Sequence, residues 1–175
     1  GKEINIDSPS VAAKTGIGMV YQHFMLIDTL TVAENMVLGF EPSIMGKFDK
    51  KKATQDVIDV AEKYGLNINP DSKVEDLSVG IQQRIEILKI LFKGAELLIF
   101  DEPSAVLTPQ EVKELYQIMR NLVKEGKTII FITHKLQEVL DVSDNITVIR
   151  KGKNAGSIKT SEATKEIIAN MMVGR

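Results

Sequence analysis

The segment Glu96-Leu97-Leu98-Ile99-Phe100-Asp101-Glu102-Pro103 starts as an apolar run and ends in two adjacent carboxylates. A short apolar run closed by Pro is typical of a buried strand, so Asp101 and Glu102 are expected at the carboxyl end of that strand. Open α/β sheets bind their ligands at this end. The pair suits phosphoryl chemistry, in which Asp101 holds Mg²⁺ and Glu102 orients a water. A capped strand end without chemistry is the alternative explanation.

Three further segments place polar residues at the end of a predicted strand or at the start of a predicted helix. Gly18-Met19-Val20-Tyr21-Gln22 is an apolar strand that delivers Gln22, and residues 129–134 form another apolar strand that ends in His134. Leu77-Ser78-Val79-Gly80-Ile81-Gln82-Gln83-Arg84 opens a helix. In this segment Ser78 is a favoured N-cap, Gly80 leaves room for close approach, and the unpaired N–H groups of the first turn favour an anion. Each of these segments alone has an ordinary structural explanation. No single structural explanation accounts for all of them occurring in this order.

In this order the four segments resemble the ATP-binding subunit of an ABC transporter, with its Q-loop, signature motif, Walker B strand and switch histidine. The resemblance covers essentially the whole chain. It implies an α/β fold, with a P-loop NTPase-like (RecA-like) parallel sheet core and an inserted helical subdomain. It predicts one nucleotide-binding domain over residues 1–175, with the helical subdomain at roughly 25–93 and the core at roughly 1–24 and 94–175.

The resemblance also implies roles for individual residues, with ATP and Mg²⁺ as the cofactors. Glu102 and His134 would be catalytic, the first orienting the attacking water and the second contacting the γ-phosphate. Asp101 and Gln22 would hold or sense Mg²⁺. The residues expected to contact ATP are Gln22 and three signature residues that close over a nucleotide held by the opposite domain, namely Ser78, Gly80 and Gln82.

The sequence contains no phosphate-binding loop of the form G-x-x-x-x-G-K-[ST]. The nearest candidate, Gly126-Lys127-Thr128, runs from a helix into a strand and is better explained as a helix C-cap. In the family this loop lies upstream of the strand that Glu3-Ile4-Asn5-Ile6 resembles. The chain is therefore expected to be amino-terminally truncated and, without the loop, inactive by itself.

The sequence departs from the family's commoner motif pattern in two places. Val79 and Ile81 replace a Gly and the Gln of the signature, and Thr108 stands where the loop after Walker B usually ends in Asp. A Thr donates and accepts hydrogen bonds but carries no charge. Communication between the two ATP sites of a dimer is expected to differ accordingly.

Further elements are predicted from local patterns. Strands are expected at residues 3–6, 17–21, 128–133 and 146–150, with a weaker one reaching Ile158. Capping boxes at Thr31 and Thr108 each predict a helix, Asp49 is expected to cap a long amphipathic helix ending near Gly65, and Ser161 is expected to start the last helix.

Composition limits the classes of partner. A net charge of −2 over 175 residues gives no electrostatic case for nucleic acid, and no apolar run reaches the 18 to 20 or so residues of a membrane span. The absence of Cys excludes a disulfide framework. Any attachment to a membrane is therefore expected to pass through a partner.

The sequences of the motifs most resemble those in the first of two tandem ATP-binding domains of importers for simple sugars and, more closely, nucleosides. That resemblance implies three partners: a second ATP-binding domain, transmembrane permease subunits and, indirectly, an extracellular substrate-binding lipoprotein. It places the protein peripherally on the cytoplasmic face of the plasma membrane. The alternatives are a soluble ABC-type ATPase acting on ribosomes or DNA, and a non-catalytic interaction module.

Overall fold

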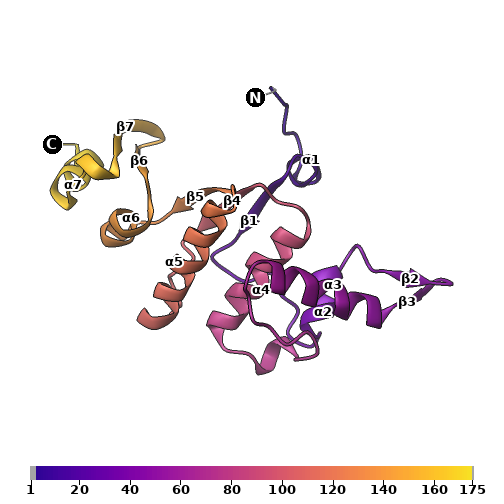
Figure 1. The fold of residues 1–175 in the computed structure, drawn as a ribbon. Helices are drawn as coiled ribbons and strands as arrows, with labels where there is room; N and C mark the ends of the chain where they lie inside the picture. Colours follow the sequence, from indigo (N-terminus) through magenta and orange to yellow (C-terminus); the bar gives the residue numbers. More distant parts are fainter. Residues whose placement is uncertain (1–2, 175) are drawn as a thin grey trace. The chain divides into compact units, whose positions relative to one another are not determined.

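The computed structural model describes residues 3–174 and divides the chain into two compact units. The first unit runs to Ile130 and the second starts at Phe131. Figure 1 shows the helices and strands of each. In the part that the model describes, no helix is long and apolar enough to cross a membrane.

A sheet with strand order β1-β4-β5 holds the core of the first unit. β1 (Ile17–Val20) pairs in parallel with β4 (Leu97–Asp101), and β5 (Thr128–Ile132) is the third strand of that sheet. Val20, Leu98 and Phe100 are fully buried. Because a Cβ on Gly18 would lie 2.8 Å from Ile90 Cβ, β1 packs directly against the helix that precedes β4. The predicted α/β fold with a parallel sheet core is confirmed.

Three helices form the insert between β1 and β4. They are α2 (Val32–Val37), α3 (Lys50–Lys63) and α4 (Val79–Phe92), which pack on one another (Figure 1). The predicted caps start all three: Thr31 with Glu34 forms a capping box, and Asp49 and Ser78 accept backbone N–H groups. A small hairpin of β2 (Ser43–Ile44) and β3 (Lys47–Phe48) and the 3₁₀ turn Val74–Asp76 complete the insert. The predicted subdomain boundaries stay a prediction.

Two buried polar side chains hold the segment that follows Gln22. Glu86 of α4 accepts the Met25 N–H through Oε1 at 2.8 Å. Asn35 of α2 accepts the Ile27 N–H at 2.8 Å and donates to the Ile27 carbonyl at 3.0 Å. Asn35 and Glu86 are almost completely buried. The segment is therefore fixed to the helices by hydrogen bonds with two buried side chains, whose polar groups would be costly to leave unpaired.

The remaining elements flank the sheet or belong to the second unit. In the first unit, α1 (Pro9–Lys14) precedes β1, and α5 (Pro109–Lys124) starts at the predicted capping box of Thr108 and Glu111. The second unit packs Ile146, Val148 and Ile168 together. Its elements are α6 (Leu136–Val142), the antiparallel pair β6 (Asn145–Arg150) and β7 (Lys153–Lys159), the 3₁₀ turn Thr160–Glu162 and α7 (Lys165–Val173).

Two local predictions are wrong. Residues 3–6 carry no strand, and the first element is α1, capped by Ser8. The prediction rested on the apolar alternation of Ile4 and Ile6 and on the resemblance to a family strand, and neither supplies the partner that a strand needs for its backbone. The last helix starts after Thr164, because Ser161 lies within a 3₁₀ turn and the Thr164 side chain accepts the Ile167 N–H.

We predict that Glu86→Ala lowers the free energy of unfolding by about 1–3 kcal/mol, because it removes a buried acceptor and leaves the Met25 N–H without its partner. Glu86→Gln retains a side-chain carbonyl oxygen and is expected to lose less. Urea denaturation of the three proteins measures the difference. Glu62→Ala, on the exposed side of α3, is the control and should change stability little. Equal losses for the Ala and Gln variants would contradict the assigned hydrogen bond.

Candidate functional site

The register of β1 and β4 brings three of the predicted site residues to one edge of the sheet. Val20 is paired with Phe100 in the parallel ladder. Asp101 is the last residue of β4, Glu102 follows it, and Gln22 lies two residues beyond Val20. The carboxyl ends of parallel strands meet at the same edge, so Gln22 and Glu102, which both lie just past the last paired residues, follow that edge of the sheet. Both carboxylates are half-buried and Gln22 is exposed.

Glu102 has a backbone φ of +43°, in the left-handed region that a side chain with a Cβ rarely adopts. The turn that follows closes through the Ala105 N–H, which donates to the Glu102 carbonyl at 3.1 Å. Pro103 and Ser104 within this turn are buried. Such strain costs about 1–3 kcal/mol and tends to occur at functional sites. The turn therefore fixes where the Glu102 backbone leaves the strand.

The signature segment forms the first turn of α4. The Ser78 hydroxyl accepts the Ile81 N–H at 3.4 Å as N-cap, and Ser78 itself is exposed. Gly80 is buried, and its N–H donates to Glu111 Oε1 at 3.1 Å. The Gln82 amide donates back to the carbonyls of Val74 and Leu77 at 3.3 and 3.0 Å. Gln82 thus has a structural role in the turn before α4, and its predicted contact with nucleotide stays a prediction.

Glu111 is a residue whose second contact the sequence did not predict. The capping box was predicted, and Oε2 accepts the Thr108 N–H at 2.9 Å and the Thr108 hydroxyl at 2.8 Å. The contact of Oε1 with Gly80 spans 31 positions in the sequence, and no local pattern reports it. Hydrogen bonds from Thr108 hold the pKa of the Glu111 carboxyl below its usual range, with smaller contributions from Gly80 and Arg84 against the effect of burial.

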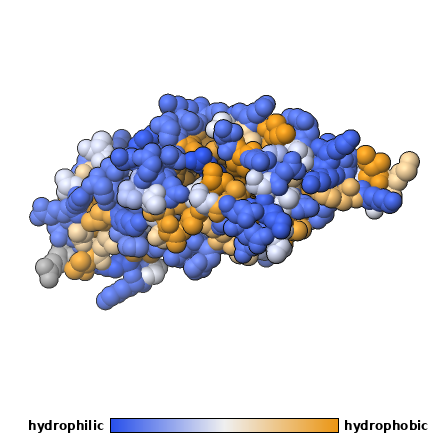
Figure 2. Space-filling view, turned by 90° about the horizontal axis from the view of Figure 1, so that it is seen from below, coloured by the Kyte–Doolittle hydropathy of each residue, from blue (hydrophilic) through white to orange (hydrophobic). Residues whose placement is uncertain are grey.

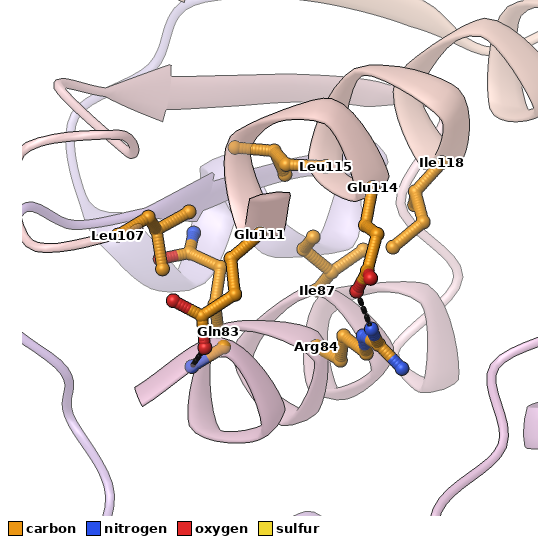
Figure 3. Close-up of a pocket in the computed structure, with 9 residues that line it drawn as sticks. Gln83, Arg84, Ile87, Leu107, Glu111, Glu114, Leu115 and Ile118 are labelled. Carbon is orange, nitrogen blue, oxygen red and sulfur yellow. Dashed lines mark hydrogen bonds and ion pairs between the residues drawn. The ribbon is translucent and has the colours of Figure 1, made fainter. Parts of the chain in front are cut away.

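Helices α4 and α5 enclose a small pocket around this contact (Figure 3). Arg84 of α4 and Glu114 of α5 form an ion pair at its side. The pocket is lined by residues of the two helices and by Leu107, the α4 members being Gly80, Gln83, Arg84 and Ile87 and the α5 members Glu111, Glu114, Leu115 and Ile118. The signature helix is therefore tied to α5 at two points.

His134 lies in the second unit, two residues after the end of β5, and is exposed. Its two neighbours belong to a local network. The Thr133 hydroxyl donates to Glu138 Oε2 and accepts the Lys135 N–H, both at 3.1 Å, and Lys135 pairs with Glu138 at 3.2 Å. Glu138 is buried, and no local sequence pattern predicts this role. The predicted approach of His134 to nucleotide beside Glu102 stays a prediction.

The chemistry of the sheet edge fits Mg²⁺ bound together with a polyphosphate. Between residues 3 and 174 there is no group of three or more His, Cys, Asp or Glu side chains that could hold a metal by themselves. Mg²⁺ at nucleotide sites takes only one or two protein carboxylates, the rest of its shell coming from phosphates and water. Asp101 at the end of β4, with the Gln22 amide oxygen following the neighbouring strand β1, fits that requirement.

Comparison with known proteins identifies the family. The model of the ABC transporter family matches residues 1–105. The nucleoside import ATP-binding protein NupA of Lactococcus lactis subsp. cremoris (strain MG1363) is 55% identical over 175 residues, which is 100% of this chain and 35% of that protein. The guanosine import ATP-binding protein NupO of Bacillus subtilis (strain 168) is 57% identical over 100% of this chain and 34% of its own length. The chain spans about a third of the length of these curated relatives.

Solved structures show the same fold. A nucleotide-free ATP-binding cassette from an ABC transporter superposes with a TM-score of 0.77 at 23% identity, covering 97% of this chain and 70% of that one. The cbiO1 protein of Clostridium perfringens, part of the ABC transporter complex cbiONQ, superposes with a TM-score of 0.69 at 27% identity, covering 91% and 62%. With the family model covering well over half of its residues, the chain belongs to the ABC transporter family.

Proposed function

We propose that this chain is part of the ATP-hydrolysing subunit of an importer for nucleosides or simple sugars, working peripherally on the cytoplasmic face of the membrane. The observation that carries the proposal is the placement of Gln22, Asp101 and Glu102 at one sheet edge by the β1–β4 register. The printed names of the relatives, which include nucleoside, guanosine and ribose import ATP-binding proteins, support the class of solute.

The proposed reaction is in-line attack of water on the γ-phosphate of ATP. The Glu102 carboxylate would accept a hydrogen bond from the water and so orient it for attack. Asp101 and Gln22 would hold Mg²⁺, which supplies positive charge against the phosphate oxygens. His134 would contact the γ-phosphate. Ser78, Gly80 and Gln82 would face the nucleotide of a second ATP-binding domain, so that hydrolysis depends on the two domains closing together.

The proposed permease contact involves the segment beside Gln22. The side chains of Tyr21, Met25 and Ile27 are 43% to 63% exposed although they are largely apolar. In the hairpin, Ile44 is 60% exposed and Met45 almost completely exposed. Figure 2 shows that hydrophobic side chains gather in patches among the hydrophilic ones on one face of the molecule. Exposed apolar patches mark contact surfaces, and permease subunits are the partners that an importer requires.

In the full-length protein, Glu102→Gln should retain Mg²⁺-ATP binding while hydrolysis falls at least about 100-fold, as expected for loss of a positioned base. Steady-state phosphate release and equilibrium nucleotide binding measure the two effects. Glu125→Gln, at the exposed end of α5, should leave both unchanged. Phosphate release by Glu102→Gln at the parent rate would remove Glu102 from the mechanism.

Gln22 is proposed to couple nucleotide to permease, since it lies between the sheet edge and the segment fixed by Glu86. Gln22→Ala should therefore reduce the ATPase rate stimulated by transport more than the basal rate. The comparison is made in proteoliposomes with and without binding protein and solute. A fall of the same proportion in both rates would argue against coupling through Gln22.

A further inference from the structure

Glu111 joins two segments that are far apart in the sequence. Its Oε2 accepts both the N–H and the hydroxyl of Thr108, which ends the loop after Glu102. Its Oε1 accepts the N–H of Gly80, in the first turn of α4, at 3.1 Å. One carboxylate therefore links the loop behind the proposed base to the signature helix.

The contact with Gly80 occupies a donor that an anionic ligand would need. The first N–H groups of a helix have no partner within it, and they are what makes a helix start attractive to phosphate. At Gly80 this donor is already used by a carboxylate, and a Cβ there would lie only 2.4 Å from Glu111 Oε1. A phosphate and the Glu111 carboxylate are both anions and would repel each other at one shared donor, so a phosphate oxygen can take the Gly80 N–H only if Glu111 leaves it.

Gln83 offers the displaced carboxylate a second donor. Its side chain is 2% exposed, and its Nε2 has no hydrogen-bond partner among residues 3–174. Gln83 and Glu111 line the same pocket, and Figure 3 shows both side chains extending into the space between α4 and α5 beside Leu107. A buried amide donor left unpaired is costly, and a carboxylate that turns toward it would remove that cost.

We infer that Glu111 acts as a latch on the signature helix α4. The Glu111 carboxylate accepts the Gly80 N–H until a nucleotide phosphate takes that N–H, and the carboxylate then accepts a hydrogen bond from the Gln83 amide. The inference rests on the proposed function, because it needs a phosphate at Gly80. Thr108 keeps Oε2 throughout, so that only one oxygen of Glu111 changes its partner. The ion pair of Arg84 and Glu114 keeps α4 and α5 joined during the exchange. Glu111 is thus a positioning residue.

The test uses steady-state ATP hydrolysis by the full-length protein. Glu111→Gln keeps an oxygen acceptor without the charge, so it competes less with phosphate, and the KM for ATP should fall about threefold to tenfold with kcat within about twofold. Gln83→Leu removes the second donor, and the KM should rise about threefold to tenfold. In the double variant the carboxylate that needs Gln83 is gone, so the effect of Gln83→Leu should shrink to less than about twofold.

The chain offers a matched control for the cap. Glu34 makes the same capping box with Thr31, at 2.8 and 2.9 Å, at the start of α2. Glu34→Gln should lower the melting temperature about as much as Glu111→Gln while leaving the KM for ATP unchanged. A structural role for Glu111 alone would give the two variants the same kinetics.

Each remaining outcome decides one question. A parent protein that neither binds nor hydrolyses Mg²⁺-ATP would overturn the proposed function. A parent that hydrolyses ATP, with the KM unchanged or raised in Glu111→Gln, or with additive effects of the two substitutions, would overturn the latch alone. If Glu111→Gln fails to fold, an unchanged KM in Gln83→Leu overturns the latch and a raised one supports it.

Discussion

The parallel pairing of β1 with β4 is the interaction on which the proposed site depends. The register that matches Val20 with Phe100 buries both side chains, and a slip by one residue would turn each strand's buried face outward. Gln22, Asp101 and Glu102 follow these residues directly, so the same register determines which polar groups share the sheet edge. Core packing and site geometry are in this sense one constraint. The insert of three helices is the connection that a parallel pair requires, since no tight turn can join its strands.

Helix α4 carries contacts with both sides of the proposed site. Glu86 holds the segment after Gln22, and Gly80, less than two turns earlier, meets Glu111. A buried carboxylate such as Glu86 is tolerated only with hydrogen-bond partners, and Met25 supplies one. A displacement of α4 would therefore strain the Gln22 segment and the Gly80 contact together. Through this shared helix, binding of a nucleotide at the signature segment would change the position of the proposed permease contact.

Sequence predicted those features that are local. Capping boxes at Thr31 and Thr108 and the caps Asp49 and Ser78 depend on residues three positions apart, and all four are present. Strand β4 was predicted from its apolar run and the acidic pair that ends it. The strand expected at residues 3–6 failed because an isolated apolar alternation says nothing about a pairing partner. Asn35, Glu86 and the contact of Glu111 with Gly80 were missed because these partners follow from packing, and polar residues in helices ordinarily face solvent.

The loop between Glu102 and Thr108 shows how strain and capping combine. Glu102 sits at a φ of +43°, a conformation that must be held from outside the residue. Buried Pro103 and Ser104 fix one end of the loop, and the Thr108 cap fixes the other. Thr108 itself carries no charge, and Glu111 is bonded to Thr108 through one oxygen and to Gly80 through the other. The carboxylate that caps the end of this loop is therefore also the group that contacts the first turn of α4, so a movement of the loop would act on both contacts at once.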